Sequence, residues 1–99
     1  MATSNQARSS SHDGVSKVGV STFATAVRSR RQQLRLRQDE VADLAGVSER
    51  FVYALENGKQ SVQLDKVAAV LFALGLHLEL HRGGGTEIRL SADLTRPMI

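Results

Sequence analysis

The sequence contains no cysteine and no tryptophan, only one proline, and 4% aromatic residues among its 99. Without cysteine there are no disulfides, thiolate metal sites or thiol nucleophiles, so packing alone must stabilise the fold, either within one chain or shared with a second copy. No apolar run approaches the roughly 20 residues of a membrane span. The polar first twenty residues also lack the apolar stretch of a secretory signal. We therefore expect a cytoplasmic protein.

The short chain argues against catalysis. A single domain of this length buries only about two thirds of its unfolded surface, which leaves little room for the walled cleft of most enzymes. No Ser/His/Asp arrangement or phosphate-cradling glycine loop is present. We expect neither an enzyme nor a bound cofactor.

The net charge of +3 hides an uneven distribution. Up to Arg37 the chain has seven basic residues and one acidic residue, whereas the remainder has six basic and nine acidic ones. Like charges repel, so the arginines gathered between Arg28 and Arg37 indicate a polyanionic partner such as nucleic acid or an anionic membrane surface. A solvated helix face is the alternative that this feature alone leaves open.

Apolar residues at helical spacing predict a mainly α-helical domain over residues 22–75. The predicted helices cover residues 23–34, 38–45, 48–57 and 64–74. We predict a disordered arm over residues 1–21 and a flexible tail over residues 91–99.

After the last helix the pattern changes to a period of two. Leu76, Leu78 and Leu80 alternate with polar residues, which predicts a half-buried β-strand. Residues 86–90 alternate more weakly and are either its hairpin partner or a loose tail. Because so short a strand is not stable alone, we expect residues 76–90 to dimerise the protein by pairing in a second copy.

The helices over residues 38–45 and 48–57 have the spacing of a helix-turn-helix. That motif needs a small residue where the helices cross, a glycine in the turn and aliphatic residues that fix the second helix. The sequence supplies Ala42, Gly46, Val47, Val52 and Leu55. The alternative is a helical hairpin that only packs.

The segment FATAVRSRRQQLRLRQDEVADLAGVSERFVYALENGK resembles the lambda-repressor/Cro-type helix-turn-helix domain, also called the XRE family. With the following SVQLDKVAAVLFALGLHLEL, the chain resembles HipB-type antitoxins. The resemblance implies a compact five-helix domain with a C-terminal dimerisation strand. It also implies a homodimer that binds a palindromic operator in double-stranded DNA, represses its own operon and binds a HipA-type serine/threonine kinase toxin. A solitary XRE-family repressor without a toxin partner is the alternative.

The resemblance also implies roles for individual residues. The recognition helix would present Ser48, Glu49, Arg50, Tyr53 and Ala54 to the bases. Chemistry agrees, because arginine can bond guanine bidentately and glutamate can accept a hydrogen bond from cytosine. Tyr53 would contact a phosphate or a thymine methyl, or it is a partly buried aromatic residue.

Two further groups follow from the same resemblance. The DNA backbone would be contacted by Gln38, Arg28, Arg30, Arg35, Arg37, Lys59, Gln60 and Ser61. Arg31 and Glu56 match an internal ion pair that ties the first helix to the third. Arg35 departs from the family pattern, since many members have a helix-ending glycine there. Arg37 departs as well, because it stands where a threonine usually caps the helix.

His77, Glu79 and His81 would share one face of the predicted strand. Two imidazoles and a carboxylate can bind a divalent metal, but no fourth ligand is evident. We therefore predict no metal site.

Overall fold

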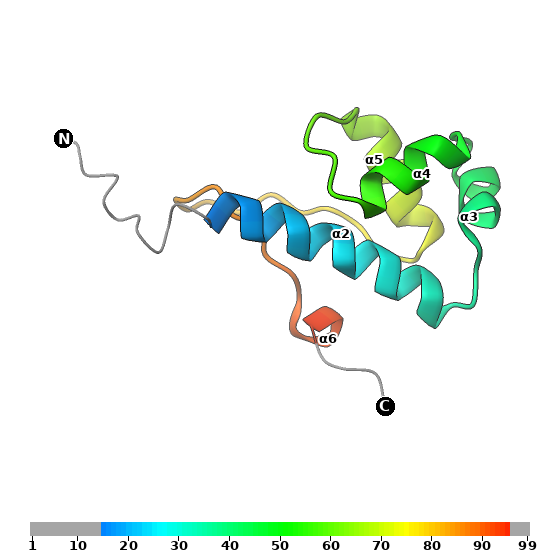
Figure 1. The fold of residues 1–99 in the computed structure, drawn as a ribbon. Helices are drawn as coiled ribbons and strands as arrows, with labels where there is room; N and C mark the ends of the chain where they lie inside the picture. The colour runs from blue at the N-terminus through cyan, green and yellow to red at the C-terminus, as the bar shows by residue number, and fades with distance from the viewer. Residues whose placement is uncertain (1–14, 96–99) are drawn as a thin grey trace.

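The computed structural model describes residues 15–95, and of residues 15–21 and 95 it describes only the backbone. Within this range the protein is helical (Figure 1). The helices are α2 (Val15–Gln33), α3 (Gln38–Ala45), α4 (Glu49–Glu56), α5 (Leu64–Ala73) and the short α6 (Ala92–Thr95). None of the helices in the described range is long and apolar enough to cross a membrane. The predicted mainly α-helical fold is confirmed.

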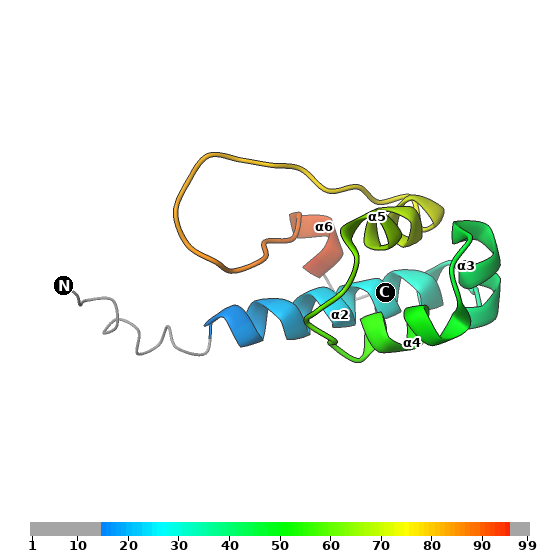
Figure 2. The ribbon, with the colours of Figure 1, turned by 90° about the horizontal axis from the view of Figure 1, so that it is seen from above.

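α3, α4 and α5 pack together over the C-terminal half of α2 (Figures 1 and 2). Their shared core consists of small and aliphatic side chains, and its fully buried members include Val27 of α2, Val41 of α3, Val52 of α4 and Leu74 at the end of α5. Each of the four helices thus contributes to one core. The orientation of α4 is fixed by this packing.

The helix-turn-helix predicted for residues 38–57 is formed by α3 and α4. Gly46 ends α3 in the left-handed conformation, with φ 71°. The N–H of Val47 then bonds the carbonyl of Ala42 at 3.0 Å. Ser48 begins α4, because its Oγ accepts a hydrogen bond from the N–H of Phe51 at 3.0 Å. A glycine stop and a serine N-cap two residues later therefore set the tight turn between the helices.

At both ends of the described range, a helix lies where the sequence predicted an unstructured segment. α2 begins at Val15, inside the segment 1–21 that was expected to be an arm, and no proline interrupts the helix. α6 lies inside the segment 91–99 that was expected to be a tail. Residues 1–14 and 96–99 lie outside the described range.

The turn between α2 and α3 contains a strained residue. Arg35 has φ 60° and is the one non-glycine residue with positive φ in the described range. The conformation is held by local bonds, since the Leu36 N–H donates to the carbonyl of Arg31 at 3.1 Å. A side chain in the left-handed region costs about 1–2 kcal/mol, which glycine avoids.

We therefore expect Arg35→Gly to raise the free energy of unfolding by about 0.5–1 kcal/mol, after the extra unfolded-state entropy of glycine is subtracted. Urea denaturation followed by circular dichroism measures the change. Arg35→Ala, which keeps the strain, should leave stability nearly unchanged. Gly46→Ala makes the opposite change, because it places a side chain on a residue in the left-handed conformation. An added Cβ meets no atom within 4 Å there, so only the backbone strain changes. A less stable Arg35→Gly would contradict the strain argument.

The strand and hairpin predicted for residues 76–90 are absent from the described residues. The Leu76 N–H donates a hydrogen bond to the Leu71 carbonyl at the end of α5. From there residues 76–90 leave the helices and return to α6 as a wide loop (Figure 2). Its outgoing and returning halves lie apart across that loop. A strand needs a neighbouring strand for its backbone hydrogen bonds, and residues 15–95 bring none beside this segment. The hairpin prediction is wrong for one chain.

Candidate nucleic-acid interface

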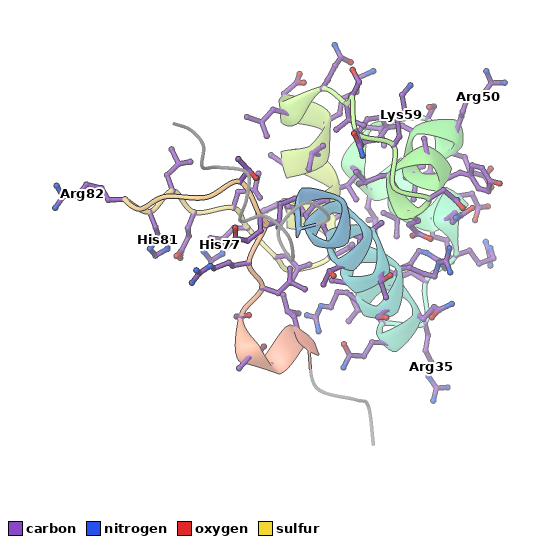
Figure 3. The ribbon with its side chains drawn as sticks, turned by 60° about the vertical axis from the view of Figure 1, so that its left-hand side comes forward. Arg35, Arg50, Lys59, His77, His81 and Arg82 are labelled. Atoms are coloured by element: carbon purple, nitrogen blue, oxygen red, sulfur yellow. The ribbon has the colours of Figure 1, made fainter. Side chains whose placement is uncertain are left out.

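α4 has one buried face and one open face. Val52 and Leu55 are buried in the core, while Glu49, Arg50 and Tyr53 are exposed. Tyr53 is 58% exposed, so the alternative of a partly buried aromatic residue is wrong for this chain. Figure 3 shows Arg50 extending away from the body of the protein. The exposed side chains of α4 can therefore meet a ligand without any rearrangement of the core.

Two more of the predicted base-contacting residues border this open face. Ala54 is half-buried on α4. Ser48 is exposed at the N-terminus, where its Oγ already accepts the capping hydrogen bond. A hydroxyl also has a donor, and that donor remains available to a ligand. The five residues predicted to read bases thus share one end and one face of α4.

A buried carboxylate fixes the other end of α4. Glu56 is 3% exposed, and its two oxygens accept hydrogen bonds from Arg31 Nε at 2.6 Å and Arg31 Nη2 at 3.0 Å. Arg31 Nη1 also donates to the carbonyl of Leu36 at 2.9 Å. The hydrogen bond to Glu56 raises the pKa of Arg31 above its ordinary value, so the guanidinium stays charged. The structure thus joins the two residues for which the resemblance implies an ion pair.

Gln38 belongs to the same network. It is the first residue of α3, and its Nε2 donates to Glu56 Oε1 at 3.1 Å. This bond was not anticipated by the sequence, which placed Gln38 only at the DNA backbone. Glu56 therefore connects α2, the start of α3 and the end of α4. Such a connection holds the two helices of the motif at a fixed mutual angle.

The arginines of α2 and the following turn have different surroundings. Arg30 donates from Nε to the carbonyl of Leu74 at 2.8 Å, which links α2 to the end of α5. Arg28 is half exposed, with its Nε 3.9 Å from Glu56 Oε1. Arg35 is exposed in the turn. We assign Arg30 a structural role because its guanidinium is engaged on a backbone carbonyl, and we keep the others as candidates for phosphate contacts.

Arg37 lies just before α3 with its charge partly balanced. Its Nε is 3.1 Å from Asp39 Oδ1, and its Nη2 is 3.6 Å from Glu40 Oε2. The hydrogen bond to Asp39 raises the pKa of Arg37. Glu40 accepts from the Arg37 backbone N–H at 2.8 Å, which ties the residue before α3 to its first turn. Arg37 itself makes no capping hydrogen bond, so the bond of the usual threonine is not replaced.

The loop after α4 carries further candidates. Lys59, Gln60 and Ser61 are all exposed, and Figure 3 shows Lys59 projecting from this loop. The Lys59 N–H donates to the carbonyl of Ala54 at 3.0 Å, which fixes the loop on α4. No ion pair involving Lys59 is formed within the described range. Its charge is therefore available to a polyanion.

The sequence did not anticipate Lys66. This lysine lies in the first turn of α5, and its Nζ is 5.9 Å from the centre of the Phe51 ring of α4. No local pattern relates residues that are so far apart in sequence, so only the fold reveals the pair. Lys66 thus places a cation over the Phe51 ring of α4.

The histidines lie on the wide loop, on the other side of the molecule from Arg50 (Figure 3). His77 Nε2 is 2.8 Å from Glu79 Oε2, and His81 Nε2 is 3.0 Å from Glu79 Oε1. Among residues 15–95, no group of three or more His, Cys, Asp or Glu side chains is arranged to hold a metal ion.

Comparison with known proteins identifies relatives. A family model described as a helix-turn-helix domain matches residues 22–82. The chain is 46% identical over 54 residues to the uncharacterized HTH-type transcriptional regulator y4mF of Sinorhizobium fredii, covering 54% of this chain and 71% of that protein. Among solved structures, the restriction-modification controller protein C.AhdI of Aeromonas hydrophila superposes with a TM-score of 0.56 and 25% identity over 61% of this chain and 91% of that one. The clp gene regulator ClgR of Corynebacterium glutamicum gives a TM-score of 0.53 and 29% identity, covering 59% of this chain and 62% of ClgR.

Proposed function

Since this chain belongs to the helix-turn-helix family of transcriptional regulators, we propose that it is a homodimeric repressor that reads a palindromic operator with α4. Members of this family are DNA-binding regulators and not enzymes. The observation that carries the proposal is the open face of α4, which is held in place from behind by the buried Glu56 network. A rigid helix with free polar side chains is what major-groove recognition requires.

We assign base recognition to Ser48, Glu49, Arg50, Tyr53 and Ala54. Arg50 is the strongest candidate, because bidentate bonding of guanine O6 and N7 is a common specific contact in the major groove. Glu49 would accept from a cytosine amino group, and Ala54 and Tyr53 would meet thymine methyls or the edge of the backbone. These contacts would define the operator sequence.

We assign phosphate contacts to the residues around α4. The set consists of Gln38, Arg28, Arg35, Arg37, Lys59, Gln60 and Ser61, and the structure adds Lys66 beside Phe51. Such contacts provide affinity and orientation without sequence choice. Of the arginines between Arg28 and Arg37, we thus assign Arg28, Arg35 and Arg37 to phosphate contacts. Arg30 and Arg31 stabilise the fold.

Lys59→Ala is expected to weaken binding to every duplex and to reduce the slope of log K against log salt by about one unit for each protomer of the dimer. Arg37→Ala should reduce the slope less, because Asp39 and Glu40 already offset that charge. Fluorescence anisotropy over a series of salt concentrations, with matched and scrambled duplexes, measures both. Equal slopes for Lys59→Ala and the wild-type protein would remove Lys59 from the phosphate-contacting set.

The function itself is tested by selection from random duplexes. We expect an inverted repeat whose half-sites lie about 34–36 Å apart, one helical turn, because two recognition helices of a dimer enter successive major grooves. A direct repeat, a single half-site or no enriched sequence would contradict the proposed dimeric repressor.

The narrower function, a HipB-type antitoxin that binds a HipA-type kinase, stays a prediction. Its support is the resemblance of residues 61–80 alone, and the relatives reported above are a transcriptional regulator, a controller protein and a gene regulator. Co-expression with the neighbouring reading frame, followed by pull-down, tests it. A kinase that copurifies would favour the antitoxin, and a protein that purifies alone would favour the solitary repressor.

A further inference from the structure

Arg37 is held by two carboxylates on the surface of α3, the helix that it precedes. Its Nε lies 3.1 Å from Asp39 Oδ1, and its Nη2 lies 3.6 Å from Glu40 Oε2. The two carboxylates raise the pKa of Arg37, and the hydrogen bond to Asp39 has the largest effect. The Arg37 side chain is nevertheless 72% exposed. A ligand can therefore reach a guanidinium that the protein itself already engages.

The other cations that we assign to phosphate contacts are not held in this way by the part of the chain that the structure describes. Figure 3 shows Arg35 and Lys59 extending away from the body of the protein, and neither forms an ion pair within that part. Arg28 Nε lies 3.9 Å from Glu56 Oε1, but that carboxylate is buried in the network described above. Arg37 differs from these residues, because its partners are surface carboxylates that an external anion can reach.

The pair between Arg37 and Asp39 is a property of this chain that the fold does not require. Arg37 departs from the pattern of the family that the chain resembles, in which a threonine usually stands at that position. A threonine carries no charge, so a chain with that pattern has neither this cation nor its restraint. The start of α3 does not depend on the pair, because Glu40 Oε1 bonds the Arg37 N–H at 2.8 Å and Asp39 favours the helix N-terminus by its charge alone.

We propose that Asp39 competes with the DNA phosphates for Arg37, so that the guanidinium leaves Asp39 when it neutralises a phosphate. This inference rests on DNA binding in the proposed function and concerns how the affinity of that same site is limited. A phosphate and a carboxylate offer similar pairs of acceptor oxygens to a guanidinium, so one can replace the other. The exchange lowers the affinity for operator and non-specific DNA alike, because phosphate contacts carry no sequence information. Asp39 thus shortens the time that the protein spends on non-specific DNA.

Asp39→Asn removes the competing charge and keeps the size of the side chain. We expect it to tighten binding to matched and scrambled duplexes by similar factors, about two- to fivefold for each protomer, since a surface ion pair is weak. Fluorescence anisotropy at one salt concentration measures both affinities. With Asp39 replaced, Arg37→Ala should also reduce the slope of log K against log salt as much as Lys59→Ala does, because no carboxylate of α3 other than Glu40 then offsets the charge.

A double-mutant cycle separates competition for Arg37 from simple repulsion between Asp39 and the phosphates. If Asp39 competes for Arg37, the gain in affinity from Asp39→Asn is smaller in the Arg37→Ala protein, where no guanidinium is released. If Asp39 only repels phosphates, the gain in the Arg37→Ala protein is equal or larger, because Arg37 no longer offsets the carboxylate. A gain that does not shrink without Arg37 would overturn the proposal.

Asp43→Asn is the matched control, since it removes the same charge from the same helix. Asp43 is exposed and forms no ion pair among residues 15–95, so its effect on affinity should be the same with and without Arg37. Asp39→Asn also removes an acidic residue from the first turn of α3, and urea denaturation checks that the variant is folded under the conditions of the titration. Asp39→Ser repeats the cycle with a second uncharged side chain that favours helix starts.

The outcomes separate the inference from the proposed function. A wild-type protein that binds its selected operator, together with Asp39→Asn and Asp39→Ser proteins that bind no more tightly, would overturn the competition and leave the repressor intact. A wild-type protein that binds neither selected nor scrambled duplexes would overturn the proposed function itself. Tighter binding by both variants that is lost in the Arg37→Ala protein would support both.

Discussion

Replacing Glu56 by glutamine is expected to lower the free energy of unfolding by about 3–5 kcal/mol, the usual cost of breaking a buried ion pair by removing one partner. The Arg31 side chain is only 13% exposed, and it would lose the carboxylate that lies 2.6 Å from its Nε. Glutamine has one acceptor oxygen in place of two, so Arg31 Nε, Arg31 Nη2 and Gln38 Nε2 would have to share it. A small domain has only about 5–15 kcal/mol in total, so this variant should unfold at much lower urea concentration.

Arg28→Ala is the matched control for this prediction. Arg28 faces the same carboxylate, but its side chain is 48% exposed and its Nε lies 3.9 Å from Glu56 Oε1. An exposed pair is worth about 0–1 kcal/mol, so stability should change little. Urea denaturation followed by circular dichroism measures both variants under the same conditions. If Glu56→Gln and Arg28→Ala lost stability equally, the buried network would not be what holds α4.

The same network links stability to DNA binding. Glu56 is the last residue of α4, Gln38 is the first of α3, and Arg31 lies on α2. Loosening this junction should change the angle at which α4 is presented, so the Glu56→Gln protein that remains folded should bind matched and scrambled duplexes alike. In that case specificity would depend on a residue that need not touch a base.

Much of the helix-turn-helix could be predicted from the sequence because its signals are local. Gly46 takes the left-handed conformation that ends α3. Ser48 caps α4 by accepting a hydrogen bond from the N–H of Phe51, three residues later. Both signals act within one helical turn. The predicted bounds of the two helices therefore agree closely with those of α3 and α4.

The parts that the sequence could not supply depend on distant residues. The guanidinium of Arg30 bonds the carbonyl of Leu74, 44 positions away, and Lys66 lies over Phe51. A charge run does not reveal which of its members face inward. The strand over residues 76–81 was predicted from alternation alone, but alternation describes two faces and supplies no partner for the backbone. Among the described residues no such partner is present.

Arg50→Ala is expected to weaken binding to the selected operator by about 5–150-fold for each half-site, corresponding to the roughly 1–3 kcal/mol of one bidentate base contact. Binding to a scrambled duplex should fall far less, because Arg50 would contribute there only as one charge among many. Arg50→Lys should not restore specificity, since a lysine keeps the charge but lacks the planar pair of donors. Anisotropy titrations with both duplexes at one salt concentration measure the ratio of the affinity for the operator to the affinity for the scrambled duplex.

Arg82→Ala is the control that removes the same charge elsewhere. Arg82 is exposed and lies on the other side of the molecule from Arg50 (Figure 3). Its removal should leave the ratio between operator and scrambled duplex unchanged. Because neither residue belongs to the buried core, both variants should keep the unfolding midpoint of the wild-type protein. If Arg50→Ala instead weakened both duplexes by the same factor, Arg50 would contact a phosphate, and base recognition would have to come from Glu49, Tyr53 and the start of α4.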